Sequence, residues 1–157
     1  MNGELKNIFV SHVHEDDALV QSLRDLLGNN GHQVRDSSID SLNPNNAHSD
    51  DYIKSGILAP SIAWASTLVV LISPETHQSD WVNWEIEYAE KQGKRIVGVW
   101  VRGGQEADMP ENLDLYADAV VGWQADRVMD AINGDISNWT RADGTLRAPR
   151  EITRYSC

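Results

Sequence analysis

The chain has 157 residues, a length that fits one domain with its own hydrophobic core. Its formal net charge of −11 disfavours a nucleic-acid partner, because no cluster of Lys and Arg residues offsets the acidic side chains over most of the chain. The single cysteine, Cys157, excludes an internal disulfide, and no apolar run approaches the roughly 18 residues that a membrane span needs, so we expect a cytoplasmic protein with no membrane contact.

The first part of the chain predicts a strand, a helix and a second strand. Residues 7–11 form a short apolar strand, and residues 18–27 carry apolar side chains at helical spacing that ends before Gly31. A weaker strand pattern covers residues 33–35. Residues 37–50 are rich in Ser, Asn and Asp, which predicts a loop long enough to close over a ligand.

The middle of the chain predicts two helices on either side of a buried strand. Residues 51–66 have a helical pattern, although Pro60 should bend or split that helix. The unbroken apolar run at residues 67–73 suits the centre of a parallel sheet. A helix then begins after the capping residues 79–80 and ends at Gly93.

The remaining elements complete an alternation of strands and helices. Residues 94–101 predict a strand, residues 103–111 a polar loop, residues 117–123 a short last strand and residues 124–133 a closing helix.

This alternation predicts an α/β fold with a doubly wound parallel sheet and right-handed crossovers. We expect residues 1–136 to form the domain. Residues 137–157 break the pattern and are locally basic, and we expect this extension to pack on the acidic domain or to contact a partner.

The helix after residues 79–80 contains the most informative side chains. At roughly 100° per residue, Trp81, Glu85 and Tyr88 fall within a wedge of about 60°, beside the apolar stripe of the helix. Glu87 points away and is expected to be solvated. Glu85 therefore differs from Glu87, because it lies among aromatic rings at the edge of the buried face, where a carboxylate can be desolvated and aimed at a ligand.

One motif in this helix has a recognisable spacing. Ser79, Trp81 and Glu85 form the pattern Ser-x-Trp-x-x-x-Glu. Three other segments carry the same resemblance as this motif. They are residues 7–12 with Asp16, residues 51–67 and residues 71–74. On these segments the chain resembles the Toll/interleukin-1 receptor (TIR) domains, in particular the TIR-like proteins of bacterial Thoeris-type antiphage systems.

The resemblance implies a flavodoxin-like, five-stranded parallel sheet with the strand order 2-1-3-4-5. In such a sheet the ligand crevice lies beyond the carboxyl ends of the strands, at the switch point between strands one and three. Ser11 and His12 end the first strand, and Ser73 ends the third. We expect these three residues, together with Trp81, to contact substrate around Glu85.

The resemblance also implies a chemistry. Glu85 corresponds to the catalytic glutamate of the NAD-cleaving TIR proteins, in which NAD is the substrate and neither a metal nor a separate cofactor is needed. An ionised carboxylate would stabilise the oxocarbenium-like ribose as nicotinamide leaves. The ADP-ribose-derived product, a cyclic ADP-ribose isomer in Thoeris-like systems, would carry a signal to an effector, and members of the family often self-associate to complete their sites.

Two other functions remain open. Many TIR domains act only as adaptors in protein interactions, in which case Glu85 has no catalytic role. Residues 85–89 followed by Gly93 and Lys94 also resemble the nucleophile region of nucleoside deoxyribosyltransferases, although Trp81 favours a TIR domain.

Several candidate residues also have an ordinary structural explanation. Asp16 and Asp17 are expected to cap the first helix, His12 lies in an acidic loop where histidines are usually solvated, and Trp81 is compatible with a core position. A receiver domain is disfavoured, because Ser73 follows the third strand where a phosphate-accepting aspartate would be needed.

Overall fold

A five-stranded parallel sheet forms the centre of the protein, with the strand order β2-β1-β3-β4-β5. In this computed structural model the strands are β1 (Asn7–Ser11), β2 (Gln33–Asp36), β3 (Thr67–Ile72), β4 (Arg95–Trp100) and β5 (Ala119–Val121). The structure describes residues 6–13, 16–36, 58–74, 76–101, 105, 108–134, 139–141 and 145. The strand order confirms the predicted flavodoxin-like sheet.

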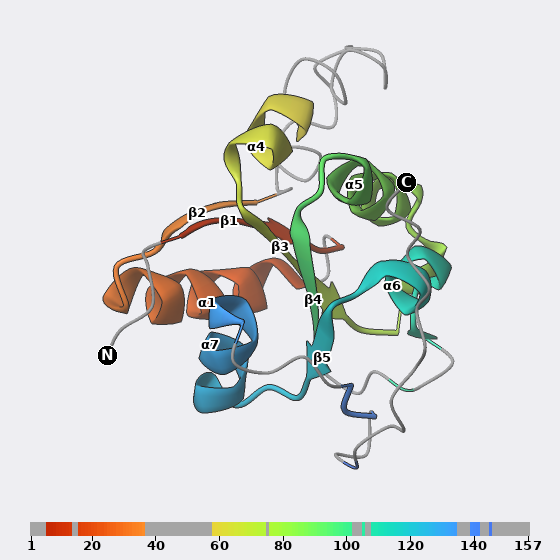
Figure 1. The fold of residues 1–157 in the computed structure, drawn as a ribbon. Helices are drawn as coiled ribbons and strands as arrows, with labels where there is room; N and C mark the ends of the chain where they lie inside the picture. Colours follow the sequence, from red (N-terminus) through yellow and green to blue (C-terminus); the bar gives the residue numbers. More distant parts are fainter. Residues whose placement is uncertain are drawn as a thin grey trace.

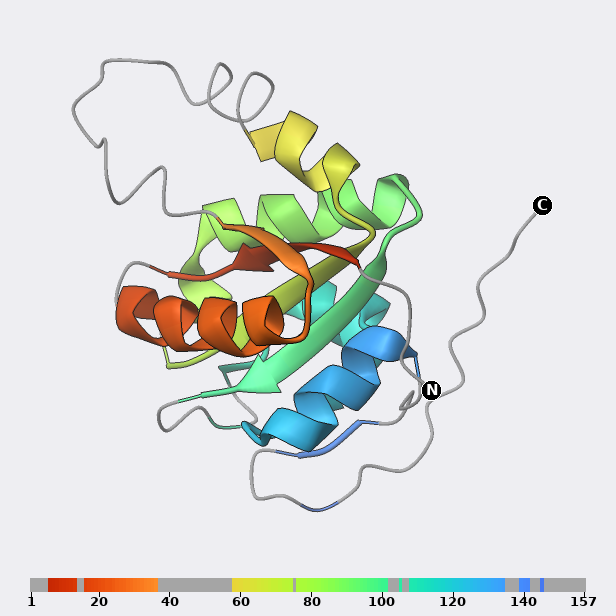
Figure 2. The same ribbon diagram turned by 90° about the vertical axis from the view of Figure 1, so that its left-hand side faces the viewer.

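Helices cover both faces of this sheet (Figure 1). They are α1 (Asp17–Asn29), α4 (Ala59–Trp64), the short 3-10 helix η3 (Thr76–Gln78), α5 (Asp80–Lys91), α6 (Glu111–Tyr116) and α7 (Ala125–Asn133). Helices α1 and α7 lie on one face, and Figure 2 shows them in front of the strands. Helices α4, α5 and α6 lie on the other face, with α5 in contact with both of its neighbours.

Strand β3 separates two hydrophobic cores. Its six residues are all buried, as expected for a central strand with helices on both faces. Leu68 and Ile72 pack into the core under α4, α5 and α6, whereas Val69 and Leu71 pack into the core under α1 and α7. The alternation of side chains along a strand thus lets one apolar run serve both cores.

The structure adds one helix that was not predicted and describes part of another that was. Helix α6 falls where only a polar loop and unassigned residues were expected, because Leu113 is its one buried residue and so short a helix has no clear period. Helix α4 begins at Ala59, and Pro60 lies in its first turn, where its missing N–H costs no hydrogen bond. The predicted loop 37–50 and residues 51–57 of the predicted helix lie outside the described residues.

The chain returns to the sheet after α7. Trp139 forms a parallel bridge with Val120 of β5, and the N–H of Thr140 donates to the Val120 carbonyl at 2.7 Å. The carbonyl of Thr140 accepts from Nε1 of Trp100 at 2.7 Å. The Oγ1 of Thr140 accepts from Arg127 at 3.1 Å. Residues 139 and 140 of the extension are therefore held against β4, β5 and α7. No helix in the described part of the chain is long and apolar enough to cross a membrane.

Gly98 in β4 lies where two neighbouring side chains leave no room for a larger residue. A Cβ atom at this position would lie 3.0 Å from Cδ1 of Ile72 and 3.0 Å from Cδ2 of Leu113. Ile72 and Leu113 are both fully buried, so neither side chain can move into solvent to make room. The close approach of α6 to the sheet thus depends on a residue without a side chain.

We expect Gly98→Val to lower the free energy of unfolding by about 1–3 kcal/mol, because the added carbons overpack this core. Chemical denaturation followed by circular dichroism measures the change. Gly28→Ala is the matched control, since a Cβ at Gly28 in α1 meets nothing within 4 Å. That control should leave stability unchanged or raise it, and a Gly98→Val protein as stable as the control would contradict the packing argument.

His32 forms a buried contact at the start of β2. Its Nδ1 accepts a hydrogen bond from the backbone N–H of Lys6 at 3.0 Å, which requires the neutral ring. Burial and, secondly, the positive charge of Lys6 lower the pKa of His32 below its usual value of 6.5. The unfolded chain therefore binds a proton at a higher pH than the folded protein does.

The stability that the neutral His32 provides should be complete above about pH 6.5 and should decrease as the pH falls through that value. We expect His32→Asn, whose side-chain oxygen can also accept from the Lys6 N–H, to have a smaller loss of stability between about pH 7 and pH 5. Denaturation curves at several pH values give this comparison. Identical pH dependence in the two proteins would show that His32 does not contribute.

Candidate active site at the switch point

Helix α5 begins where the sequence places it. Ser79 is the N-cap, and its Oγ accepts a hydrogen bond from the N–H of Val82 at 3.1 Å. Asp80 lies in the first turn, where a negative charge complements the helix dipole. Gly93 follows the helix with a φ angle of +72°, a conformation that glycine adopts readily. These end signals fix the register that places Glu85 in the second turn.

Glu85 is fully buried and lies against the end of β1. Its side chain exposes 0 % of its surface, and so does that of Ser11. The Ser11 hydroxyl donates to Oε1 of Glu85 at 2.5 Å, across 74 residues of sequence. Such a short O–H···O contact is typical of a charge-assisted hydrogen bond to a carboxylate. The structure therefore brings together two of the residues that the sequence singled out.

Asp16 does not cap α1 as expected. It occupies the N-cap position, but its side chain makes no capping hydrogen bond to the helix. Its Oδ2 accepts instead from the hydroxyl of Ser73, at 2.6 Å, and Asp16 exposes none of its surface. A buried carboxylate needs strong hydrogen bonds, and the one from Ser73 is worth more than a cap at a solvated helix end.

Thr76 holds Ser73, the donor of this contact, in place. The Oγ1 of Thr76 accepts from the backbone N–H of Ser73 at 2.9 Å and donates to the carbonyl of Leu71 at 3.0 Å. Thr76 Oγ1 also lies 3.1 Å from Ser73 Oγ. Since the hydroxyl protons of Thr76 and Ser73 go to Leu71 and Asp16 respectively, the turn after β3 is tied both to its own strand and to the start of α1.

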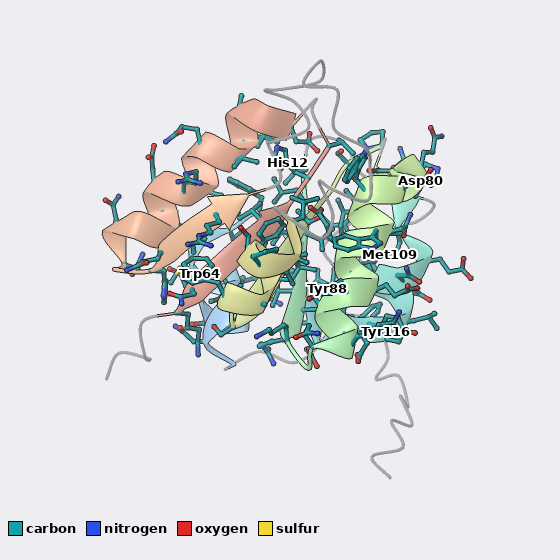
Figure 3. All side chains as sticks on the ribbon, turned by 90° about the horizontal axis from the view of Figure 1, so that it is seen from above. His12, Trp64, Asp80, Tyr88, Met109 and Tyr116 are labelled. Atoms are coloured by element: carbon teal, nitrogen blue, oxygen red, sulfur yellow. The ribbon has the colours of Figure 1, made fainter. Side chains whose placement is uncertain are left out.

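His12 is buried, contrary to the expectation of a solvated loop histidine. It exposes 3 % of its surface. In the view from above, the labelled His12 lies between α1 and α5 (Figure 3). It directly follows Ser11 and therefore belongs to the same edge of the sheet as Glu85.

The aromatic residues of α5 lie partly buried along the α4–α6 side of the sheet. Trp81 and Tyr88 both pack against the core on this side, in agreement with the wedge expected from helical spacing. The ring of Tyr88, however, stacks on Trp84, with centroids 5.2 Å apart and an interplanar angle of 15°. Glu87 is exposed as predicted, and Lys91 forms an ion pair with it at 3.4 Å.

Sequence reasoning missed the roles of Asp16 and Thr76. The signal for Asp16 was available, because it lies shortly after β1 and a parallel sheet places that position beside the residues that follow β3. Thr76 gave no such signal, since its role depends on the shape of one turn. Among the described residues, no group of three or more His, Cys, Asp or Glu side chains could hold a metal ion.

The sequence of the chain matches a known family over most of the region that builds this site. The family profile described as "Thoeris protein ThsB, TIR-like domain" matches residues 9–106. The chain belongs to this TIR-like family. The matched region includes the last three residues of β1 and all of β3 and α5, so it contains Ser11, Asp16, Ser73 and Glu85. No curated protein matches the chain at a significant level of sequence similarity.

Solved structures confirm the fold of this TIR-like domain at low sequence identity. A conserved protein from Enterococcus faecalis V583 has 13 % identity and a TM-score of 0.59, over 85 % of this chain and 100 % of that chain. The CMP N-glycosidase BcmB of Clostridium botulinum has 15 % identity and a TM-score of 0.55, over 83 % and 100 %. The TIR domain of the Toll-related receptor TRR-2 from Hydra magnipapillata has 13 % identity and a TM-score of 0.52, over 82 % and 91 %.

We expect Ser73→Ala to lower the free energy of unfolding by about 1.5–3 kcal/mol, because it removes a hydrogen bond to a buried carboxylate. Urea denaturation measures the loss. Ser66→Ala is the control, since the Ser66 hydroxyl makes an exposed hydrogen bond to the carbonyl of Asn7, and it should change stability by less than about 0.5 kcal/mol. Equal effects of the two substitutions would show that the Asp16–Ser73 contact does not stabilise the domain.

Proposed function

We propose that this TIR-like domain cleaves the N-glycosidic bond of NAD between nicotinamide and ribose, with Glu85 as the catalytic residue. The observation that carries the proposal is a fully buried glutamate, held by a serine at the switch point of the sheet. Burying a carboxylate is costly, and pairing it with a donor from a distant strand is typical of a functional site. The Thoeris family match supports the same assignment.

The chemistry requires one negative charge near the ribose. As the C1′–N1 bond of the nicotinamide riboside breaks, its electron pair returns to the pyridine nitrogen and nicotinamide leaves as a neutral molecule. The positive charge moves to C1′ and the ring oxygen of the ribose. The Glu85 carboxylate opposes that charge, and in a water-poor site the attraction is much stronger than in bulk solvent.

The burial of Glu85 also affects substrate access. A group with no exposed surface touches a substrate only when the neighbouring side chains move apart. Trp81, which is partly buried beside the core, would then pack against the nicotinamide or ribose. A site that opens for substrate and closes around it controls the entry of water.

Exclusion of water decides the product. Water attacking C1′ gives ADP-ribose and releases a proton, whereas a ring nitrogen of the adenine in the same molecule gives a cyclic ADP-ribose isomer. We propose the cyclic product as a signal to an effector in antiphage defence, in accordance with the Thoeris family. Self-association through TIR surfaces would complete the enzyme, so assays should include high protein concentrations.

A second candidate is cleavage or transfer at the N-glycosidic bond of a nucleoside or nucleoside monophosphate. The fold shared with a CMP N-glycosidase favours it, because that protein breaks the same kind of bond. It would use Glu85 in a similar role, so only the substrate distinguishes it from the NAD hypothesis. A purely adaptor function is the remaining alternative, and it leaves the burial of Glu85 against Ser11 without a purpose.

Glu85→Gln should lower the rate of nicotinamide release from NAD on the order of a thousand-fold, because the amide has a similar shape but no charge. Liquid chromatography with mass spectrometry measures nicotinamide and identifies the second product. The melting temperature should change little, since Ser11 can still donate to the amide oxygen.

Glu87→Gln is the matched control, because Glu87 is exposed on the same helix and pairs only with a neighbouring lysine in the described structure. It should retain wild-type turnover. Equal turnover by wild type and Glu85→Gln would refute the mechanism. Turnover of CMP or a deoxynucleoside, with none of NAD, would instead select the second candidate.

A further inference from the structure

The Ser11 hydroxyl has a defined hydrogen-bonding role. A serine hydroxyl carries one proton and can donate only one strong hydrogen bond at a time. In this structure that proton points to Oε1 of Glu85, at a donor–acceptor distance of 2.5 Å. Ser11 is fully buried, so no solvent competes for the proton. A substrate hydroxyl or carbonyl could receive it only by breaking this contact.

Both ends of the contact are held by rigid elements. Ser11 is the last residue of β1 and pairs in register with Val70 of the central strand. Glu85 lies on α5, whose buried residues Val82, Ile86 and Ala89 anchor it to the core. The glutamate side chain has three rotatable bonds, and the hydrogen bond removes the freedom that the packed backbone leaves to the carboxylate.

The neighbouring serine provides an internal comparison. Ser73 directly follows β3, and its hydroxyl donates to Asp16. Each of the two serines at this edge of the sheet therefore gives its proton to a buried carboxylate. Neither arrangement leaves the hydroxyl proton available to a ligand, although both serines were expected to bind substrate.

We infer that Ser11 is a positioning residue that orients the carboxylate of Glu85 for the reaction, and does not donate to substrate. The inference rests on the proposed function for its catalytic part, because it assigns a role relative to Glu85. A hydroxyl that donates to Oε1 fixes the plane of the two carboxylate oxygens. Ser11 thus orients the carboxylate of Glu85 so that its charge can stabilise the ribosyl cation.

The test compares Ser11→Ala with Ser11→Thr in the nicotinamide-release assay. Loss of a hydrogen bond to a charged group corresponds to about a ten- to hundred-fold lower kcat. We expect this loss in Ser11→Ala with KM within about twofold of wild type, because substrate contacts are unchanged. Ser11→Thr keeps the hydroxyl and should recover most of the kcat. Melting temperatures establish that each variant is folded.

Two results would overturn the inference. A raised KM with unchanged kcat would make Ser11 a substrate ligand, and wild-type kcat in Ser11→Ala would remove it from the chemistry. Both leave the proposed function intact as long as Glu85→Gln is inactive in the same assay.

A second measurement does not depend on turnover. The melting temperatures of Ser11→Ala, of Glu85→Ala, which removes both carboxylate oxygens, and of the double variant form a double-mutant cycle. We expect the double variant to lose clearly less than the sum of the two single losses, because the second substitution removes a partner that is already missing. Additive losses in melting temperature would show that Ser11 and Glu85 do not interact, which would overturn the inference. If wild-type protein releases no nicotinamide, the proposed function fails, and the cycle still decides whether Ser11 holds Glu85.

Discussion

The parallel pairing of β1 with β3 is the constraint on which the site depends. The chain leaves β1 towards α1 on one face of the sheet and leaves β3 towards α5 on the other, so the strand order reverses between them. With Ser11 opposite Val70, the residues that follow both strands come to the same edge. The contacts of Ser11 with Glu85 and of Asp16 with Ser73 both cross this boundary.

The same two contacts contribute both to the stability of the sheet and to the geometry of the site. Asp16 and Glu85 are fully buried carboxylates in a chain that already has a net charge of −11. Apolar residues would be less costly at both positions, since each carboxylate gives up hydration that a hydrogen bond only partly replaces. The two serines reduce that cost, and one of them, Ser11, acts on Glu85, the residue to which we assign the proposed chemistry.

Much of the fold could be predicted from the sequence because its strongest signals are local. The apolar run of β3, the Ser79 cap and the glycine after α5 each determine an element within a few residues. Topology then placed Ser11 near Glu85. Helix α6 could not be predicted, because its one buried side chain, Leu113, fits beside Gly98 on another element.

The sequence predicts which residues lie at this edge of the sheet, but it does not predict the hydrogen bonds that they form. The sequence shows that Asp16 precedes a helix, which suggests a cap, but which donor its carboxylate accepts from depends on the position of Ser73 in space. Likewise, the acidic residues around His12 suggested solvation, whereas neighbouring elements bury it. Local pattern gives the residue types at an edge, and only the packed structure decides which donor meets which acceptor.

The short stretch at Trp139 and Thr140 covers the β5 edge of the sheet. Strand β5 has three residues, and its central carbonyl, that of Val120, already accepts from Thr140. A strand from another molecule could not pair with β5 at that point without displacing a segment that Trp100 and Arg127 also hold. The chain thereby shields one edge of its sheet from intermolecular strand pairing, using its own backbone as the terminal neighbour.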